Sequence, residues 1–522
     1  MRRMTALLGA AALAVPALIS VTAEPAQAAS GSVTVTTLTR AGGKITTQLT
    51  IMNLTTGSLY NGTSGKAVAL PKGRYAVSTD IWNNQDDTDT LGAQVVTVSD
   101  SNVATTIDAR KGKPLTVGLS SSPGTGYSQT LQAHVCGGSN LSLQMGLAGG
   151  SNNAGHMYVI PNASKDVQFG YLSLWQKGSD TLIAKGGYTG LPSAPGGTFA
   201  RGNMTTVSVQ ARRGPQEGRY GSLYVEPKYT TCTTGMPGQL LNDAFPYTTT
   251  LHLTAGTWTL QAEDEADASG GTEIVGDLYR TVSAAPGTAP LSQIFYRSAW
   301  GPARTLPYVF AGRLGYDTGE AFDDPSTTGF EASERSTAQL SFGSTVLARG
   351  TVTDWGGPDS TFYSGMKSTG WYTLAVTSTR YRPGVTFPTN MLSTASSVKF
   401  HFKADPRTDA AVPGFLTQFV PGGLTLNNTA TPHTTTAVAL WVVRPSVGPN
   451  APTPKDTVKS VKVYASNNGG LTWAYQPVKH SGSAWSVNIA NPSSGAISLR
   501  SLVTDAAGDT TETTVYRAYA LG

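Results

Sequence analysis

The stretch VKSVKVYASNNGGLTW, residues 458–473, shows the pattern that decides the fold of this chain. From Val458 to Tyr464 apolar and polar side chains alternate, which is typical of a strand with one buried face. The residues SNNGG at 466–470 then supply a turn, because Asn and Gly tolerate left-handed backbone. Further alternating runs follow at 485–489, 496–503 and 514–519. After the prolines at 449, 452 and 454, this series predicts an immunoglobulin-like sandwich over 446–522.

The same pattern extends over the preceding chain. Short β-rich runs separated by turn residues predict a small sandwich over 29–110. Alternating runs at 205–210, 249–254 and 398–402 predict two further sandwiches, at 111–240 and 241–445. No repeat of fixed period is present, which argues against a propeller or solenoid. The predicted fold class is therefore all-β, with several β-sandwich domains in tandem and the last one immunoglobulin-like.

Composition supports this fold class and excludes one kind of partner. The 522 residues include 59 Gly and 30 Pro, and charged residues make up only 13%. A formal net charge of +5 is small over this length, and the longest basic clusters are RKGK at 110–113 and RR at 212–213. Nucleic-acid binding needs many Lys and Arg on one face. No nucleic-acid partner is therefore expected.

The first 28 residues predict export. Arg2 and Arg3 precede an apolar run from about 7 to 21, and AQA at 26–28 offers the small residues that a signal peptidase recognises. The sequence predicts a secretory signal peptide over 1–28 and a secreted, extracellular protein. No later apolar run is long enough to span a bilayer, so no transmembrane segment is expected in the mature chain.

Cys136 and Cys232 are the two cysteines of the chain. An even number of cysteines in an oxidising compartment predicts one disulfide between them. A pair of buried free thiols is the alternative.

Several motifs resemble a known family. Ser466-x-Asn468-x-Gly470-x-Thr472-Trp473 resembles the Asp-box hairpin, with Asn468 where Asp is usual. With 504–509 and 516–519, this C-terminal segment is similar to the last domain of large secreted actinobacterial subtilisin-like serine peptidases. The similarity extends upstream through 107–114 and 369–374. The resemblance implies that nearly the whole mature chain corresponds to the non-catalytic accessory region of these enzymes.

A second, shorter resemblance concerns the first sandwich. The segment Leu70-Pro71-Lys72-Gly73-Arg74-Tyr75 resembles the turn before a strand in carboxypeptidase-regulatory-like, transthyretin-like sandwiches. That resemblance implies that Gly73 makes the turn and that Tyr75 enters the core.

The catalytic motifs of the subtilisin-like peptidases are missing. Gly62-Thr63-Ser64 is followed by Gly65-Lys66 rather than Met-Ala, Asp317-Thr318-Gly319 comes after it, and there is no His-Gly-Thr-His. A single Asp-Thr-Gly does not make an aspartic peptidase, which needs two carboxylates that share a proton. The expectation is a protein that is not an enzyme, with the catalytic domain absent.

Acidic and aromatic residues provide the remaining candidates. Acidic clusters between strands predict weak calcium sites at Asp86, Asp87 and Asp89 and at Asp323 and Asp324, and Glu263–Asp267 is a third cluster. No other cofactor is expected. Tryptophans beside polar, turn-rich sequence are the candidate ligand-binding aromatics, although most aromatics of a sandwich fill its core: Trp82, Trp300 and Trp355.

Taken together, these features predict a secreted, non-enzymatic binding or adhesion protein built from peptidase-accessory-like sandwiches. Its expected partner is a protein or a cell-envelope component. One alternative is a carbohydrate-binding module that holds a polysaccharide through exposed Trp. The other is an unrecognised hydrolase that uses one of the acidic clusters.

Overall fold

The computed structural model describes residues 31–83, 87–121, 124–137, 141–149, 156–214, 220–228, 232, 239–242, 244–268, 271–324, 327–331, 334–353, 361–445 and 456–522. In these ranges the regular structure is almost entirely β-strand, with two three-residue 3-10 turns, η1 (Ala109–Lys111) and η3 (Arg201–Asn203). The all-β prediction is confirmed. The predicted signal peptide lies outside the described residues. Within them, no helix is long and apolar enough to cross a membrane.

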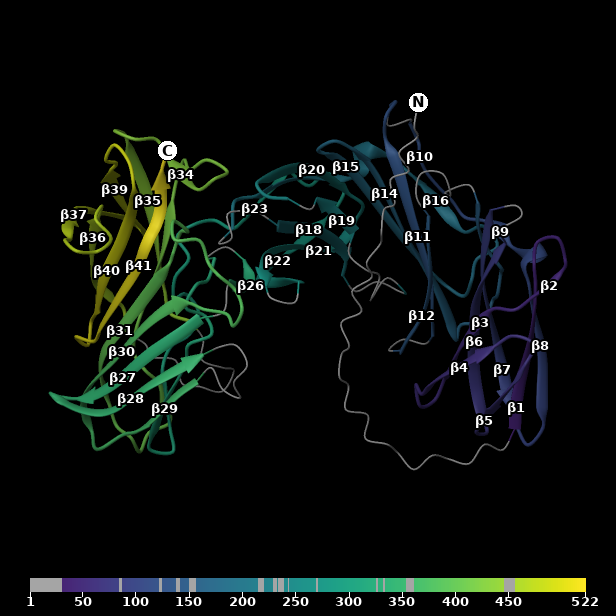
Figure 1. Cartoon of the computed structure of the whole chain (residues 1–522), viewed down its shortest axis with the longest axis horizontal. Helices are drawn as coiled ribbons and strands as arrows, with labels where there is room; N and C mark the ends of the chain where they lie inside the picture. Colours follow the sequence, from purple (N-terminus) through teal and green to yellow (C-terminus); the bar gives the residue numbers. More distant parts are fainter. Residues whose placement is uncertain are drawn as a thin grey trace.

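The N-terminal sandwich consists of two sheets (Figure 1). The first contains β1 (Gly31–Leu38), β2 (Lys44–Ile45), β5 (Ala67–Leu70) and β8 (Asn102–Asp108). The second has the order β4 (Leu59–Thr63), β3 (Gln48–Asn53), β6 (Gly73–Asn83), β7 (Thr88–Val98), β13 (Met157–Val159), β9 (Lys113–Pro114). Tyr75 is fully buried between them, and its hydroxyl donates to the Pro71 carbonyl at 2.8 Å. The turn at 70–75 thus places Tyr75 in the core, as the resemblance implies.

Two larger sheets form the middle of the molecule. The seven-stranded sheet has the order β12 (Leu141–Gly149), β11 (Ser128–Gly137), β14 (Val167–Lys177), β15 (Asp180–Thr189), β20 (Tyr247–Leu253), β17 (Thr205–Ala211), β23 (Leu291–Phe295). The five-stranded sheet has the order β19 (Gln239–Asn242), β18 (Tyr220–Pro227), β21 (Gly256–Ala268), β22 (Gly271–Ala284), β26 (Thr328–Glu331). A parallel pair, β10 (Thr116–Leu119) with β16 (Gly196–Phe199), completes this part.

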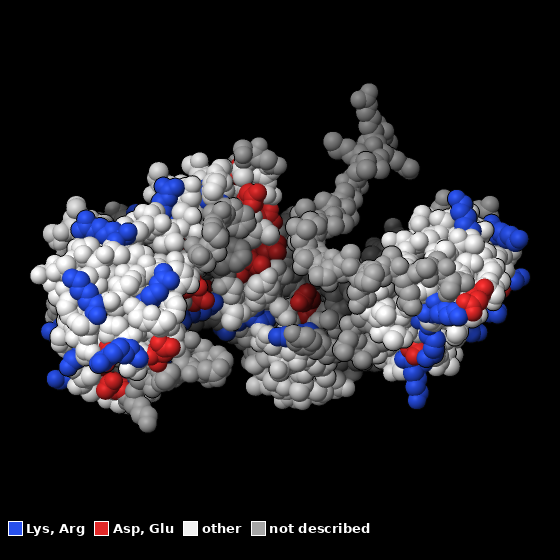
Figure 2. Space-filling model, turned by 90° about the horizontal axis from the view of Figure 1, so that it is seen from below, with Lys and Arg blue, Asp and Glu red and all other residues white. Residues whose placement is uncertain are grey.

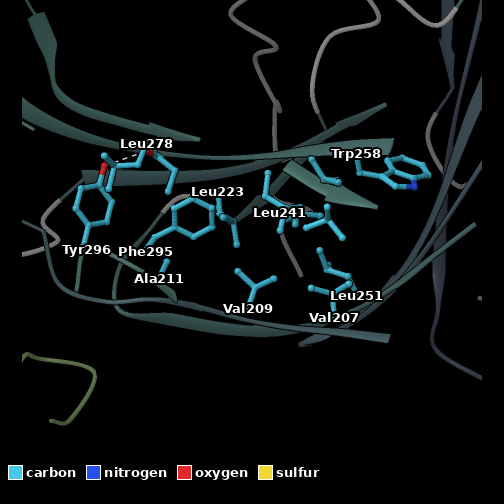
Figure 3. Packing of buried hydrophobic residues seen from close by; sticks show 14 of the residues in the cluster. Val207, Val209, Ala211, Leu223, Leu241, Leu251, Trp258, Leu278, Phe295 and Tyr296 are labelled. Atoms are coloured by element: carbon cyan, nitrogen blue, oxygen red, sulfur yellow. Dashed lines mark hydrogen bonds between the residues drawn. The ribbon is translucent and has the colours of Figure 1, made fainter. Parts of the chain in front are cut away.

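The seven-stranded sheet is buried on both faces, so four sheets are stacked. On β14, Phe169 and Tyr171 pack with the second sheet of the N-terminal sandwich, whereas Leu172 and Leu174 pack with the five-stranded sheet. Figure 3 shows the latter core, in which Val207 and Leu251 lie opposite Leu223, Leu278 and Trp258. Burial on both faces explains the nearly continuous apolar sequence of β14.

One nine-stranded sheet runs through the C-terminal part (Figure 1). Its order is β28 (Thr345–Thr353), β27 (Glu334–Phe342), β30 (Gly370–Arg380), β31 (Ala395–Ala404), β41 (Thr510–Leu521), β40 (Ala496–Asp505), β36 (Val458–Ser466), β37 (Ala474–Gln476), with β34 (Thr429–Ala430) parallel to β41. One half packs on β29 (Thr361–Gly365), β25 (Arg313–Asp317), β24 (Tyr308–Phe310) and β32 (Ala410–Ala411). The other half packs on β33 (Leu416–Pro421), β35 (Thr435–Val443), β39 (Ala484–Ala490) and β38 (Val478–Ser481).

Both covering sheets lie on the same face of the nine-stranded sheet. The antiparallel pair β31–β41 joins its halves, with Ser396 opposite Val515 and Phe400 opposite Thr511. Opposed residues point to the same face of a sheet. Phe400 belongs to one core and Val515 to the other, so both cores share this face. None of the described strands covers the opposite face, which is called here the outer face.

The C-terminal sandwich has immunoglobulin topology but begins earlier than predicted. Its sheets, β33-β35-β39-β38 and β34-β41-β40-β36-β37, have the strand order of a seven-stranded immunoglobulin domain with one additional strand at each edge of the second sheet. Residues 446–522 supply only β36–β41, while β33–β35 precede the predicted boundary. Strand pairing also crosses the other predicted boundaries, because β13 pairs with β7 and β20 pairs with β17. The boundaries predicted at 110, 240 and 445 therefore do not mark the edges of sheets.

Two features connect these layers. The predicted disulfide is present between Cys136 of β11 and Cys232, which lies between β18 and β19. Further along, the fully buried Asn428 joins the middle sheets to the immunoglobulin-like sandwich. Its Nδ2 donates to the carbonyls of Tyr296 (2.9 Å) and Arg213 (3.0 Å), and its Oδ1 accepts from Arg212 (3.3 Å) and the Ser298 amide (3.4 Å).

Candidate binding surface

A depression lies on the outer face of the nine-stranded sheet, at the seam between its two halves. Its volume is about 220 Å³. Two rows of residues line it, and the members of each row lie opposite one another on neighbouring strands. The first row consists of Thr373 on β30, His401 on β31 and Thr510 on β41. The second row consists of Lys399 on β31, Glu512 on β41 and Leu502 on β40. Because all four strands belong to one sheet, the backbone hydrogen bonds of the sheet fix the relative positions of these side chains.

An aromatic platform borders this seam depression. The Trp371 ring is stacked on the imidazole of His401, with ring centres 4.8 Å apart and an interplanar angle of 11°. His401 Nδ1 is hydrogen-bonded to Thr373 Oγ1 at 2.9 Å, which fixes the imidazole plane. Trp371 remains 39% exposed. The surface thus offers an aromatic ring beside hydroxyl, amine and carboxylate groups.

A second aromatic group lies on the other side of the depression. The Arg500 guanidinium lies 4.1 Å from the centre of the Trp473 ring, and its Nε is 3.8 Å from Glu512 Oε1. The Asp-box-like hairpin holds Trp473 in place: Asn468 Oδ1 accepts from the Thr472 amide at 3.0 Å, and Ser466 Oγ accepts from the Gly470 amide at 2.9 Å. Asn468 therefore makes the internal hydrogen bonds of this hairpin despite replacing Asp.

The predicted ligand-binding tryptophans have three different outcomes. Trp82, on β6, is 42% exposed, so its ring is accessible. Trp300 is fully buried and packs edge-on against Tyr296, with ring centres 6.5 Å apart, so the prediction of an exposed ring is wrong at this position. Trp355 lies outside the described residues. Trp371 was not among the predicted residues, although its outward position on an alternating strand was a usable signal.

The described calcium candidates do not form an oxygen-rich loop. Asp323 and Asp324 lie in the interior, 3% and 0% exposed. Asp89 lies on β7, where burial and the neighbouring Asp80 raise its pKa to about 7. Asp87 lies beside His156, 3.7 Å from its Nδ1, and Asp86 lies outside the described residues. No group of three or more His, Cys, Asp or Glu side chains in the described ranges is arranged to hold a metal ion.

The third acidic cluster, Glu263–Asp267, is part of strand β21 rather than a loop. Its alternation turns Asp264 fully inward, while Glu263 points outward and lies opposite Asp277 of β22. The Tyr279 hydroxyl donates to Asp277, and Gln261 Nε2 donates to Glu263 at 2.8 Å and to Asp277 at 3.1 Å. Figure 2 shows Asp and Glu gathered in the middle of the molecule, where residues 220–295 contain eight acidic and two basic side chains.

The Glu263–Asp277 pair should make stability depend on pH. Burial, followed by the charges of Asp277 and Glu265, raises the pKa of Glu263 from 4.5 to about 7. A carboxyl whose pKa is higher in the folded state stabilises the protein most at low pH, and this contribution is lost as the pH rises from 4.5 to 7. We expect the unfolding temperature to fall over this interval, and Glu263→Gln to reduce the fall and to stabilise the protein at pH 8.

Thermal unfolding followed by circular dichroism between pH 4 and 8 measures this effect. Asp100→Asn removes a carboxylate from an exposed ion pair with Lys72 and is the control for a change in net charge. An identical pH profile for Glu263→Gln and the parent protein would contradict the prediction.

A carboxylate–histidine–hydroxyl line on the seven-stranded sheet was missed by the sequence analysis. Asp180 Oδ1 lies 3.0 Å from His252 Nε2, and His252 Nδ1 lies 3.3 Å from Thr206 Oγ1, as in the relay of a serine hydrolase. Arg201 Nη2 also lies 2.9 Å from His252 Nε2 and donates to Asp180 Oδ2 at 3.0 Å, so the Asp180 carboxylate is shared between the guanidinium and the imidazole. The cluster therefore cross-links three strands of the sheet, β15, β17 and β20.

Comparisons with known proteins place the chain in no family. No protein-family model and no curated protein matches it. Among solved structures, a polysaccharide lyase has 8% identity and a TM-score of 0.14, over 58% of this chain and 40% of the lyase. Sidekick-1 immunoglobulin domains 1–5 have 10% identity and a TM-score of 0.11, over 94% of this chain and 97% of that one.

A third similar structure is trypsin-activated α2-macroglobulin from Escherichia coli. It has 8% identity and a TM-score of 0.14, over 90% of this chain and 39% of the macroglobulin. The chain thus spans about two fifths of the length of the lyase and of the macroglobulin.

Proposed function

We propose that this chain is an exported, non-enzymatic binding or adhesion protein that attaches to a component of the cell envelope through the outer face of its nine-stranded sheet. The observation that carries this proposal is the seam depression with the Trp371–His401 stack at its border. The two sandwiches beneath this face share one continuous sheet, so the binding groups are held in place before a ligand arrives. Preorganisation of this kind reduces the entropic cost of binding.

Export is supported by two independent features. The N-terminal sequence has the charged, apolar and small-residue regions of a signal peptide. The Cys136–Cys232 disulfide also fits an oxidising compartment, where such bonds persist.

A carbohydrate ligand is favoured over a protein by the chemistry around Trp371. An exposed indole ring offers a flat surface on which the C–H face of a sugar stacks, and Thr373, Thr510 and Glu512 beside it offer hydrogen-bonding groups for sugar hydroxyls. The buried centre of a protein interface is poor in charged residues, whereas Lys399 and Glu512 both line this depression.

Replacing Trp371 by alanine tests the location of the binding surface. Co-sedimentation of residues 29–522 with isolated cell walls and insoluble glycans should show binding that weakens about tenfold in Trp371→Ala, because buried aromatic anchors dominate binding energies. Trp441→Ala is the matched control, since Trp441 is also 39% exposed but lies on β35 of a covering sheet. Equal losses in the two variants, or no loss in Trp371→Ala, would overturn the proposed surface.

A further inference from the structure

The outer face of the nine-stranded sheet carries an excess of positive charge. Strand pairing turns six basic side chains to this face: Arg335, Arg349, Lys399, Lys403, Lys462 and Arg500. In the described residues of these strands, Glu512 is the one acidic side chain that points the same way, whereas Glu334 and Asp505 are buried on the opposite face. A charge excess on one face attracts ligands of the opposite sign.

Three of the six basic groups, Lys399, Lys462 and Arg500, lie in the seam depression or next to a residue that lines it. Lys399, Glu512, Leu502 and Lys462 lie side by side on four consecutive strands, β31, β41, β40 and β36. Strands are about 4.8 Å apart, so this row places the two lysines about 14 Å from each other, on either side of Glu512. Arg500 pairs with Glu512 at 3.8 Å, which offsets the one negative charge in the row.

We propose that the ligand is an anionic polysaccharide that lies across the strands of the outer face, an inference that rests on the binding function proposed above. Its acidic groups pair with Lys399 and Lys462, while a sugar ring stacks on Trp371. The seam depression receives the part of the chain between these contacts, and Thr373, Thr510 and Glu512 bind its hydroxyls. Neutral glucans supply the stacking but leave the row of cations without partners.

Binding to three defined glycans tests the charge requirement. Residues 29–522 are applied to immobilised polygalacturonate, which carries carboxylates, to phosphomannan, which carries phosphates, and to a neutral β-glucan, at about 0.1 and 1 M NaCl, where the Debye length is about 10 and 3 Å. We expect retention on one or both acidic glycans, lost at high salt, and no comparable retention on the glucan. Which acidic glycan is retained identifies carboxylate or phosphate as the recognised group.

Variants of the lysine row locate the charge effect. The double variant Lys399→Gln/Lys462→Gln should bind the acidic glycan about tenfold more weakly, equivalent to about 1.4 kcal/mol. Lys479→Gln on β38 of a covering sheet removes an exposed lysine elsewhere and should bind normally.

Different experimental results would overturn the anionic ligand and the binding function. Salt-independent binding to the glucan that depends on Trp371 would overturn the anionic ligand and leave the binding function standing. If the protein binds none of the three glycans but still binds cell walls through Trp371, the anionic ligand is likewise overturned and the binding function stands. If every outer-face variant still binds cell walls as well as the parent protein does, both proposals are overturned.

Discussion

Replacing Asn428 by alanine should destabilise the protein by about 3–4 kcal/mol, because the substitution leaves buried backbone carbonyls and the Arg212 guanidinium without partners. Asn428 is fully buried, and its side chain bonds to four groups on two segments of the middle sheets. Its backbone φ of 56° is also a conformation that Asn adopts more readily than Ala. The midpoint of the first transition in urea unfolding, followed by tryptophan fluorescence, should move to a lower urea concentration.

Two further variants separate the causes. Asn428→Asp tolerates the same backbone but removes both N–H donors, so it should destabilise the protein strongly if the hydrogen bonds matter. Asn427→Ala alters the exposed neighbour and should stay within about 0.5 kcal/mol of the parent. Equal effects of the 427 and 428 substitutions to alanine would contradict the role given to Asn428.

Removing the disulfide should have a comparable effect on the middle of the molecule. The Cys136–Cys232 bond closes a loop with a sequence separation of 96 residues, and the chain-entropy estimate for such a loop is about 4–5 kcal/mol. It connects β11 of the seven-stranded sheet to the connection between β18 and β19 of the five-stranded sheet. We therefore expect Cys136→Ser/Cys232→Ser to lower the unfolding temperature by several degrees.

The reducing agent provides the internal control for this experiment. Dithiothreitol should lower the unfolding temperature of the parent protein to that of the double variant and leave the variant unchanged. A parent protein that unfolds at the same temperature with and without the reductant would show that the bond contributes little.

Local alternation was enough to predict the fold class. The run from Val458 to Tyr464 became β36, with Val461 and Val463 in the core and Lys462 outside. The turn at 466–470 and the disulfide could also be predicted, because their signals are contained in short stretches or in the residue count.

Pairing between distant strands could not be predicted. The prolines at 449, 452 and 454 predict a linker, yet β35 before them and β36 after them belong to one sandwich. Likewise β31 and β41 both alternate, but nothing in either strand specifies that Lys399 lies opposite Glu512. The seam depression depends on that pairing, so its residues could be assigned to an outward face but not to one site.

Trp300 shows the limit of judging exposure from neighbours. Its polar neighbours predict a surface position, but the backbone amides of this stretch bond inside the protein: the Ser298 amide donates to Asn428, and the Trp300 amide donates to Ser393 Oγ at 3.1 Å. The backbone around a buried tryptophan can therefore be satisfied by distant segments, which its own neighbours do not reveal.

The central place of β41 in the nine-stranded sheet has a consequence for the order of folding. Of the described strands, β41 is synthesised last, yet it hydrogen-bonds to β31, β40 and β34. Until it arrives, β31 presents an unpaired edge, and such edges promote association with other chains. Folding of this half therefore ends with the addition of β41, and a chain that lacks this strand has an aggregation-prone edge that the folded protein conceals.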